Sequence, residues 1–179
     1  MLTVIAPPGS LAARIASQVE ASTSLPKPCA IVDAMPTTRA APLAELTNAD
    51  FEAGCIASLA DLAATLANLV PEHRHIVLIG TNAGLGDWDA ALAGAFAAGA
   101  VGLMRSAALE YAGEGVTMNY IALPSSDAAL VPGAAAMAGA LLAAGSVNGQ
   151  IIVCDGGAHL RMRAARPRSA ALPAASPQA

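Results

Sequence analysis

The amino-acid sequence predicts an α/β fold in which a parallel sheet of about five strands is covered by helices on both faces. Short apolar runs alternate with longer segments of helical periodicity along most of the chain, and this alternation is typical of parallel sheets. The 179 residues suit one compact domain. Because 55% of them are hydrophobic but only 3% are aromatic, we expect a core of many small, closely packed side chains.

Apolar runs and periodic segments give the order of the elements. Strands are expected at Leu2–Ala6, Cys29–Asp33, His75–Gly80, Val116–Leu123 and Gln150–Cys154. Helices are expected at Leu11–Ala21, Phe51–Val70, Ala90–Ala112 and Ala128–Ala144. Ser10 is the expected cap of the first helix, and Asn48 or Asp50 that of the second. The domain is expected to span residues 1–158, followed by a disordered or partner-bound tail at 159–179 that is rich in Pro, Ala, Ser and Arg.

Charge and cysteine usage narrow the class of protein. Residues 1–160 carry all 13 acidic residues and five of the nine basic ones, and the other four are arginines of the tail. An acidic domain argues against a nucleic-acid partner, because phosphate contacts need clustered Lys and Arg. The uncharged run at 128–154 is broken by Pro and Gly, so we expect no membrane span there. Three widely spaced cysteines and no secretory leader predict free thiols and a cytoplasmic location.

The first loop does not support a phosphate site. A dinucleotide fingerprint needs glycines that let the backbone approach a pyrophosphate at a helix N-terminus. This loop reads APPGSLA, with one glycine and with two prolines that remove backbone donors. We therefore predict no cofactor at this turn.

From Ala30 to Leu160 the order of landmarks resembles that of the short-chain dehydrogenase/reductase family. The resemblance is carried by IVDAMP at 31–36, by the helix and strand GLMRSAALEYAGEGVTMNYIALP at 102–124, and by GQIIVCDGG at 149–157. It implies a Rossmann-like sheet. Between the first helix and CAIVD, however, the chain lacks the two strand-helix units that complete the adenosine half of the cofactor site in that family. The lid expected after Pro124 is also reduced.

The resemblance also places the family's catalytic residues on this chain. The catalytic Asn falls on Ser58, and the catalytic Ser falls on Thr81 or, without a gap, on Gly80. The Tyr and Lys of the Tyr-x-x-x-Lys turn fall on Ala93 and Ala97. A shift of one residue places them instead on Gly94 and Ala98, so neither frame holds a Tyr or a Lys. Because this Tyr supplies the acid/base proton and the Lys lowers its pKa, hydride transfer by the family's mechanism is not expected.

Other candidate residues favour structural roles. Tyr111 and Tyr120 are expected to pack, and Asp87 and Asp89 to cap the helix that follows them. The pair His73 and His75 in EHRH has no evident third metal ligand, so we favour a solvated loop over a metal site.

The long helix from Ala90 to Ala112 carries the strongest remaining signal, because it has no charged face. At 100° per residue one face holds Ala93, Ala97, Ala100, Met104 and Ala108, and the opposite face holds Ala95, Ala98, Gly102, Ser106 and Leu109. In the family this helix and the preceding one pack against their copies in a neighbouring subunit, and residues of the second face are the expected interface. The alternative is a helix covered by its own chain's tail.

The leading hypothesis is a non-catalytic subunit, a pseudoenzyme, that supports a heteromeric short-chain dehydrogenase. A homodimeric scaffold and an oxidoreductase with atypical residues are the alternatives. No cofactor and no metal are expected. The sequence leaves open the partner, the substrate of any complex, and the choice between homo- and hetero-oligomer.

Overall fold

The computed structural model describes residues 2–22, 24–25, 28–124 and 127–160. The expectation of a tail at 159–179 falls mostly outside this part of the chain. The described structure continues past residue 158, since Ala158–Leu160 form a 3₁₀ turn.

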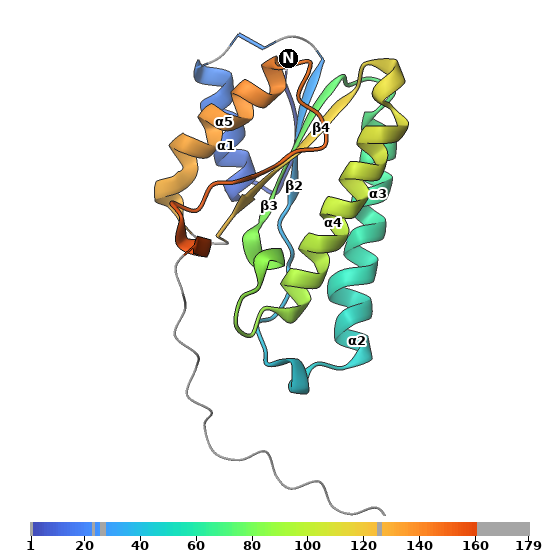
Figure 1. Ribbon diagram of the computed structural model, residues 1–179, viewed down its shortest axis with the longest axis vertical. Coiled ribbons are helices and arrows are strands. Elements are labelled where there is room, and N and C mark those ends of the chain that lie inside the picture. The colour runs from blue at the N-terminus through green and yellow to red at the C-terminus, as the bar shows by residue number, and fades with distance from the viewer. Residues whose placement is uncertain (1, 23, 26–27, 125–126, 161–179) are drawn as a thin grey trace, which may run out of the picture.

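Five strands form one parallel sheet, as the sequence predicts, and their order in the sheet is sequential, β1-β2-β3-β4-β5 (Figure 1). The three central strands are buried over nearly their whole length, whereas β1 and β5 form the two edges. Near-continuous apolar runs are what strands buried on both faces require. The strands are β1 Leu2–Ile5, β2 Cys29–Ala34, β3 His75–Thr81, β4 Thr117–Leu123 and β5 Ile151–Val153.

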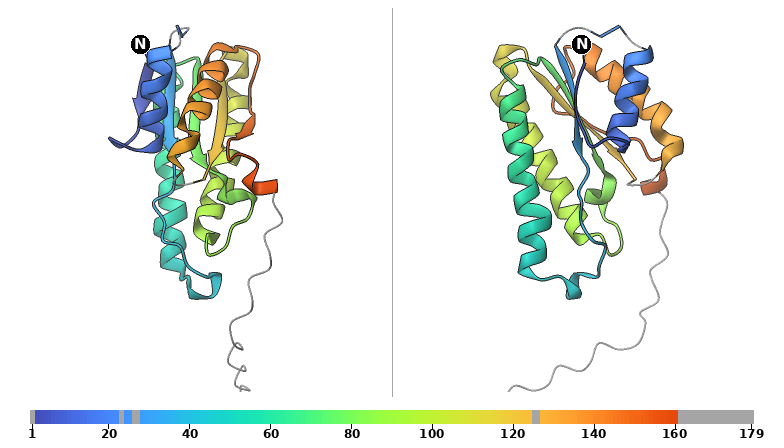
Figure 2. Two further views of the ribbon diagram at one scale, coloured as in Figure 1. Left: turned by 90° about the vertical axis from the view of Figure 1, so that its left-hand side faces the viewer. Right: turned by 180° about the vertical axis from the view of Figure 1, so that it is seen from behind.

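Helices cover both faces of this sheet and create two cores (Figure 2). Helices α1, Leu11–Ser22, and α5, Val131–Ala143, lie on one face. Helices α3, Ser58–Leu69, and α4, Ala91–Glu110, lie side by side on the other. Alternate residues of each central strand point to the two cores, as a pleated strand requires.

The crossover connections between neighbouring strands include both right-handed and left-handed ones. Each crossover steps one strand further in the same direction across the sheet, yet α1 and α5 lie on the opposite face from α3 and α4. Crossovers that step the same way on opposite faces have opposite hands. Since about 98% of parallel crossovers are right-handed, two of these four are of the rare left hand.

The segment expected as one helix at Phe51–Val70 has three parts. A short α2, Asn48–Phe51, leads into a π-helical turn, Glu52–Ala57, and then into α3. The expected caps Asn48 and Asp50 are wrong. Thr47 is the cap, in a reciprocal capping box with the side chain of Asp50. At the first helix Ser10 is confirmed as the cap, because its Oγ accepts from the amide of Ala13 at 3.2 Å.

At the amino end of the sheet, the expectation of a solvated loop at His73 and His75 is wrong. His73 is only 8% exposed. One ring nitrogen lies 3.0 Å from the carbonyl of Leu69 and the other lies 2.7 Å from the Thr3 hydroxyl, so His73 ties the edge strand β1 to the end of α3. His75 begins β3 and bonds Thr117 at 2.9 Å. No group of three metal-ligating side chains occurs among the described residues.

Two asparagines fix the short strand β5 to its neighbours. The Oδ1 of Asn148 accepts from the Met118 amide at 2.8 Å, and its Nδ2 donates to the Ala108 carbonyl at the end of α4. Asn119 bonds both ends of the loop that leads into β5, through Val147 and Gln150. All three cysteines are free, as expected.

Candidate functional site

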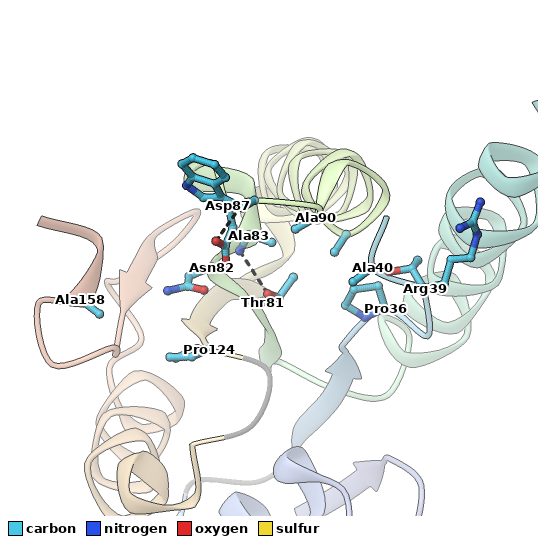
Figure 3. A pocket seen from close by; sticks show the side chains of 13 residues that line it. Pro36, Arg39, Ala40, Thr81, Asn82, Ala83, Asp87, Ala90, Pro124 and Ala158 are labelled. Atoms are coloured by element: carbon cyan, nitrogen blue, oxygen red, sulfur yellow. Dashed lines mark hydrogen bonds between the residues drawn. The ribbon is translucent and has the colours of Figure 1, made fainter. Parts of the chain in front are cut away.

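A cleft of about 400 Å³ opens at the carboxyl ends of β2, β3 and β4 (Figure 3). This edge is where ligands bind in open α/β sheets. Its polar lining comes from Thr38 and Arg39 after β2 and from Thr81, Asn82 and Asp87 at and after the end of β3. The remaining lining residues are Pro36, Ala40, Ala83, Trp88, Ala90, Ala93, Pro124 and Ala158.

The polar groups at the end of β3 are engaged in holding the loop. The hydroxyl of Thr81 accepts from the amide of Ala83 at 3.1 Å, and this bond caps the 3₁₀ turn that follows. The Nδ2 of Asn82 donates to Asp155 at 3.0 Å. Neither group is therefore an obvious nucleophile or base.

Asp155, after β5, joins three parts of the cleft rim. Its carboxylate is only 6% exposed and accepts from Asn82, from the amides of Gly157 and His159, and from the ring of His159. Burial alone would raise the pKa of Asp155, but the hydrogen bonds from His159, Asn82 and Gly157 outweigh it and lower the pKa to about 2. Asp155 is thus an ionised structural clamp between the ends of β3 and β5.

Arg39 is the basic residue that lines the cleft, but its guanidinium pairs with Asp50. Its Nε lies 3.3 Å from Asp50 and its Nη2 donates to the carbonyl of Glu45 at 2.9 Å. Figure 3 shows this side chain on the far side of the cleft from Thr81 and Asn82. The hydrogen bond from Arg39 lowers the pKa of Asp50, with help from Thr47. A ligand would have to break this ion pair to recruit the guanidinium.

The loop that carries Trp88 is tied to the loop after β2. The amide of Ala41 donates to the carbonyl of Asp89 at 2.7 Å, and Asp89 has a positive φ of 55°. The expectation that Asp87 and Asp89 cap the long helix is wrong, because α4 begins after Ala90 without a side-chain cap. Asp87 instead accepts from the amide of Trp88 at 2.8 Å.

The structure places Thr81 beside two of the other three positions that the family resemblance marks. Thr81 and Ala93 both line the cleft, and Thr81 and Ala97 both line a second cavity. Ser58 lies instead beside a smaller cavity near β1. The cleft thus lies where ligands bind in open α/β sheets, and its described lining contains no tyrosine, lysine or histidine.

The second cavity has a volume of about 250 Å³, is mostly apolar, and has Tyr120 among the residues that line it. A Cβ at Gly80 would overlap the phenol of Tyr120, so β3 needs a glycine there. The hydroxyl donates to the carbonyl of Thr81 at 3.3 Å, and burial raises the pKa of Tyr120 far above its usual value. Packing is therefore confirmed as its role, and Tyr111 also packs on this core at the end of α4.

The two faces of α4 differ as the 100° spacing predicts. Ala97, Ala100, Met104 and Ala108 are buried and Ala93 is partly buried. All five residues of the opposite face are exposed, namely Ala95, Ala98, Gly102, Ser106 and Leu109. By length and composition α4 could cross a membrane, as core helices of globular proteins also could, and its inner face packs in the core.

Several residues that line the cleft are not predicted from the sequence. Trp88, Asn82 and Thr38 come from loops whose sequence carries no periodicity. The contact from Asn82 to Asp155 joins residues far apart in the chain, and the only signal for it was the Asp-Gly-Gly at the end of the last strand.

Comparisons with known proteins support the fold. No family model and no curated protein matches the chain. Among solved structures it is similar to the crystal structure of enoyl-[acyl-carrier-protein] reductase (NADH) from Aquifex aeolicus VF5, with a TM-score of 0.61 and 18% sequence identity. The match covers 74% of this chain but 64% of the other. At this identity the likeness shows the fold alone, which is an α/β Rossmann-like fold.

Proposed function

We propose that this protein is a non-catalytic subunit of short-chain dehydrogenase/reductase fold, which supports a heteromeric dehydrogenase through the outer faces of its helices. The observation that carries the proposal is the lining of the cleft. The residue at the position of the catalytic Tyr is Ala93, and the described lining contains no tyrosine, lysine or histidine. Reduction of a carbonyl needs a proton donor at the reacting oxygen, and the alanine at position 93 supplies none.

Neither tyrosine of the chain replaces the missing acid. Tyr120 lies in the second cavity, and its hydroxyl is bonded to the strand end. Tyr111 follows the carboxyl end of α4, far along the helix from Ala93 at its start.

The adenosine half of a dinucleotide site is also poorly supported. On the far side of β1, where further strands would extend the sheet, Val4 and Ile5 are 38% and 41% exposed. The crossover from β1 through α1 to β2 has the opposite hand to the crossovers through α3 and α4. If the strand after α1 paired with the free edge of β1 instead of the edge that β2 occupies, this crossover would have the same hand as those of α3 and α4. This geometry supports the loss of strand-helix units between α1 and β2.

The outer faces of α3 and α4 supply the assembly surface. The outer face of α4 that holds Ala95, Ala98, Gly102, Ser106 and Leu109 carries no charge, and the exposed Arg105 and Glu110 lie beside it. Leu109 is 80% exposed, and Ile56, in the π-helical turn before α3, is 62% exposed. A helix face directed to solvent normally carries charged side chains, so an apolar face of this extent favours a partner.

Two measurements test the proposal. Titration of the purified full chain with NADH and with NADPH, followed by fluorescence, should show no saturable binding at micromolar concentrations. Affinity isolation of the tagged chain from its native cells should recover a catalytic chain of the same fold, and the single substitution Ala98→Arg should abolish that recovery. Micromolar cofactor binding would contradict the proposal.

An oxidoreductase with atypical residues is the second candidate, and the cleft itself is the observation that favours it. A volume of about 400 Å³ could hold part of a small ligand. The same titration separates the two candidates, because this enzyme would need the cofactor.

A further inference from the structure

Residues 161–179 of the sequence follow directly on the rim of the cleft. Ala158 lines the cleft, and the 3₁₀ turn Ala158–Leu160 ends immediately before this segment. Figure 3 shows Ala158 on the opposite side of the cleft from Pro36. The turn is held in place because Asp155 accepts from Asn82 of the lining and from the amide of His159. The segment therefore starts at one wall of the cleft.

The segment is long enough to reach the other wall. At about 3.4 Å per residue the six residues from Leu160 to Arg166 span up to about 20 Å, whereas a sphere of the cleft's volume is about 9 Å across. Arg166 therefore reaches the far side of the cleft without a straight path.

The cleft and the segment carry opposite charge. Residues 82–93, which form one wall, hold two aspartates and no basic residue, and Asp87 is an exposed part of the lining. Arg39, the one basic residue of the described lining, is paired with Asp50. Residues 161–179 hold four arginines and no acidic residue. Electrostatic attraction therefore favours the segment at this wall.

Trp88 gives the cleft a surface that suits arginine and proline. Its side chain lines the cleft, and the residue is 42% exposed. Guanidinium groups stack on indole rings, and proline-containing segments dock in grooves lined by aromatic side chains. Arg166, Pro167 and Arg168 combine both residue types in consecutive positions.

From this position, length, charge and composition we infer that the cleft is a docking site for residues 166–168 of the same chain. Pro167 then lies against the indole of Trp88, and an arginine beside it pairs with Asp87. A volume of about 400 Å³ is at the lower end of the range of ligand pockets and suits a short peptide segment. Because the segment is tethered at Leu160, its effective concentration at the cleft is on the order of millimolar, so a modest affinity keeps the cleft occupied.

Fluorescence of the full chain tests the docking. Trp88 is the only tryptophan of the sequence, so its emission reports on the cleft. Arg166→Glu/Arg168→Glu should raise the constant for acrylamide quenching of Trp88 at least about two-fold, because the segment no longer covers the indole. Ala174→Glu/Ala175→Glu adds two carboxylates further along the same segment. It is the matched control and should be quenched like the wild-type chain.

A synthetic peptide of residues 161–172 tests the cleft from outside. It should bind the Arg166→Glu/Arg168→Glu chain saturably, with a change in Trp88 fluorescence. It should bind the wild-type chain at least about ten-fold more weakly, because the tethered segment competes. Asp87→Asn in the double variant keeps an acceptor for the Trp88 amide but removes the charge, and it should weaken peptide binding about three-fold.

Three results would overturn the inference. They are equal quenching of the wild-type and Arg166→Glu/Arg168→Glu chains, no binding of the peptide to the double variant, and quenching of the wild-type chain that rises on dilution. The last result would show that the docked segment comes from a second copy.

The inference goes beyond the proposed function, which concerns the outer faces of the helices, and NADH titration of the Arg166→Glu/Arg168→Glu chain keeps the two apart. Micromolar binding of NADH contradicts the proposed function whatever the quenching shows. Equal quenching without NADH binding refutes this inference alone.

Discussion

Replacement of Asp155 by Asn tests whether the cleft rim is held by an ionised carboxylate. All four hydrogen-bonding groups around Asp155 are donors in this arrangement: the amide of Asn82, the backbone amides of Gly157 and His159, and the ring of His159. An asparagine has the same shape, but one of its two terminal atoms is itself a donor. Asp155→Asn therefore leaves at least one of these groups facing another donor in a buried site.

The magnitude follows from the pKa. The carboxyl of Asp155 has a pKa of about 2 in the folded chain against an ordinary value of 3.8. At 1.36 kcal/mol per pKa unit the ionised form is stabilised by about 2.4 kcal/mol on folding. Because the folded pKa is the lower one, this stability is fully present above pH 3.8 and is lost as the pH falls through 2. At pH 3 about half of it, roughly 1.3 kcal/mol, should remain.

Urea denaturation of the wild-type and Asp155→Asn chains at pH 7 and pH 3 measures this difference. We expect the variant to be less stable by about 2 kcal/mol at pH 7 and by roughly half as much at pH 3. The reasoning is refuted if the difference at pH 7 is below about 0.5 kcal/mol, or if it is the same at both pH values.

Three further substitutions test the packing around the sheet. Gly80→Ala should lower the free energy of unfolding by about 2–3 kcal/mol, because the added methyl group overlaps the side chain of Tyr120. Tyr120→Leu in the same chain should recover part of this loss, and an unchanged stability in urea denaturation would contradict the overlap. His73→Ala removes the bond to Thr3, so amide exchange in β1 should accelerate at least ten-fold while that of β4 stays as it was; unchanged exchange in β1 would show that the bond does not hold the edge. Asn148→Ala leaves buried backbone groups of β4 and α4 unpaired and should lower the free energy of unfolding by about 2–3 kcal/mol, and a loss under about 0.5 kcal/mol would count against that role.

The sequence predicts the fold well because its signals are local. Eight of the nine expected strands and helices occur within a few residues of their expected bounds, since each apolar run ends near a Pro, Gly, Asn or Asp, and the ninth, expected at Phe51–Val70, is divided into three parts. The inner face of α4 is also predicted, because helical spacing alone decides which side chains share a face. The π-helical turn at Glu52–Ala57 is not, since it depends on how α3 fits its neighbours.

The candidate site is predicted less completely, because its contacts join distant segments. The strand-end position of Thr81 follows from the sequence, but the clamp of Asp155 on Asn82 requires β3 and β5 to lie two strands apart in one sheet. His73 is a similar case. A histidine between charged residues suggests a solvated loop, and only the neighbouring edge strand provides the hydroxyl that makes its burial favourable.

The sequential order of the strands has a consequence for how the chain folds. Every strand pairs with the one before it, so each pairing closes only the loop of one intervening helix, and such contacts form fast. The packing of α1 on α5 is different, because it joins the two ends of the domain. We therefore expect the half around β2, β3, α3 and α4 to form in the folding transition state and the α1–α5 contact to form late. Substitutions at Ile15 or Leu142 would then speed unfolding, whereas substitutions at Leu66 or Met104 would slow folding.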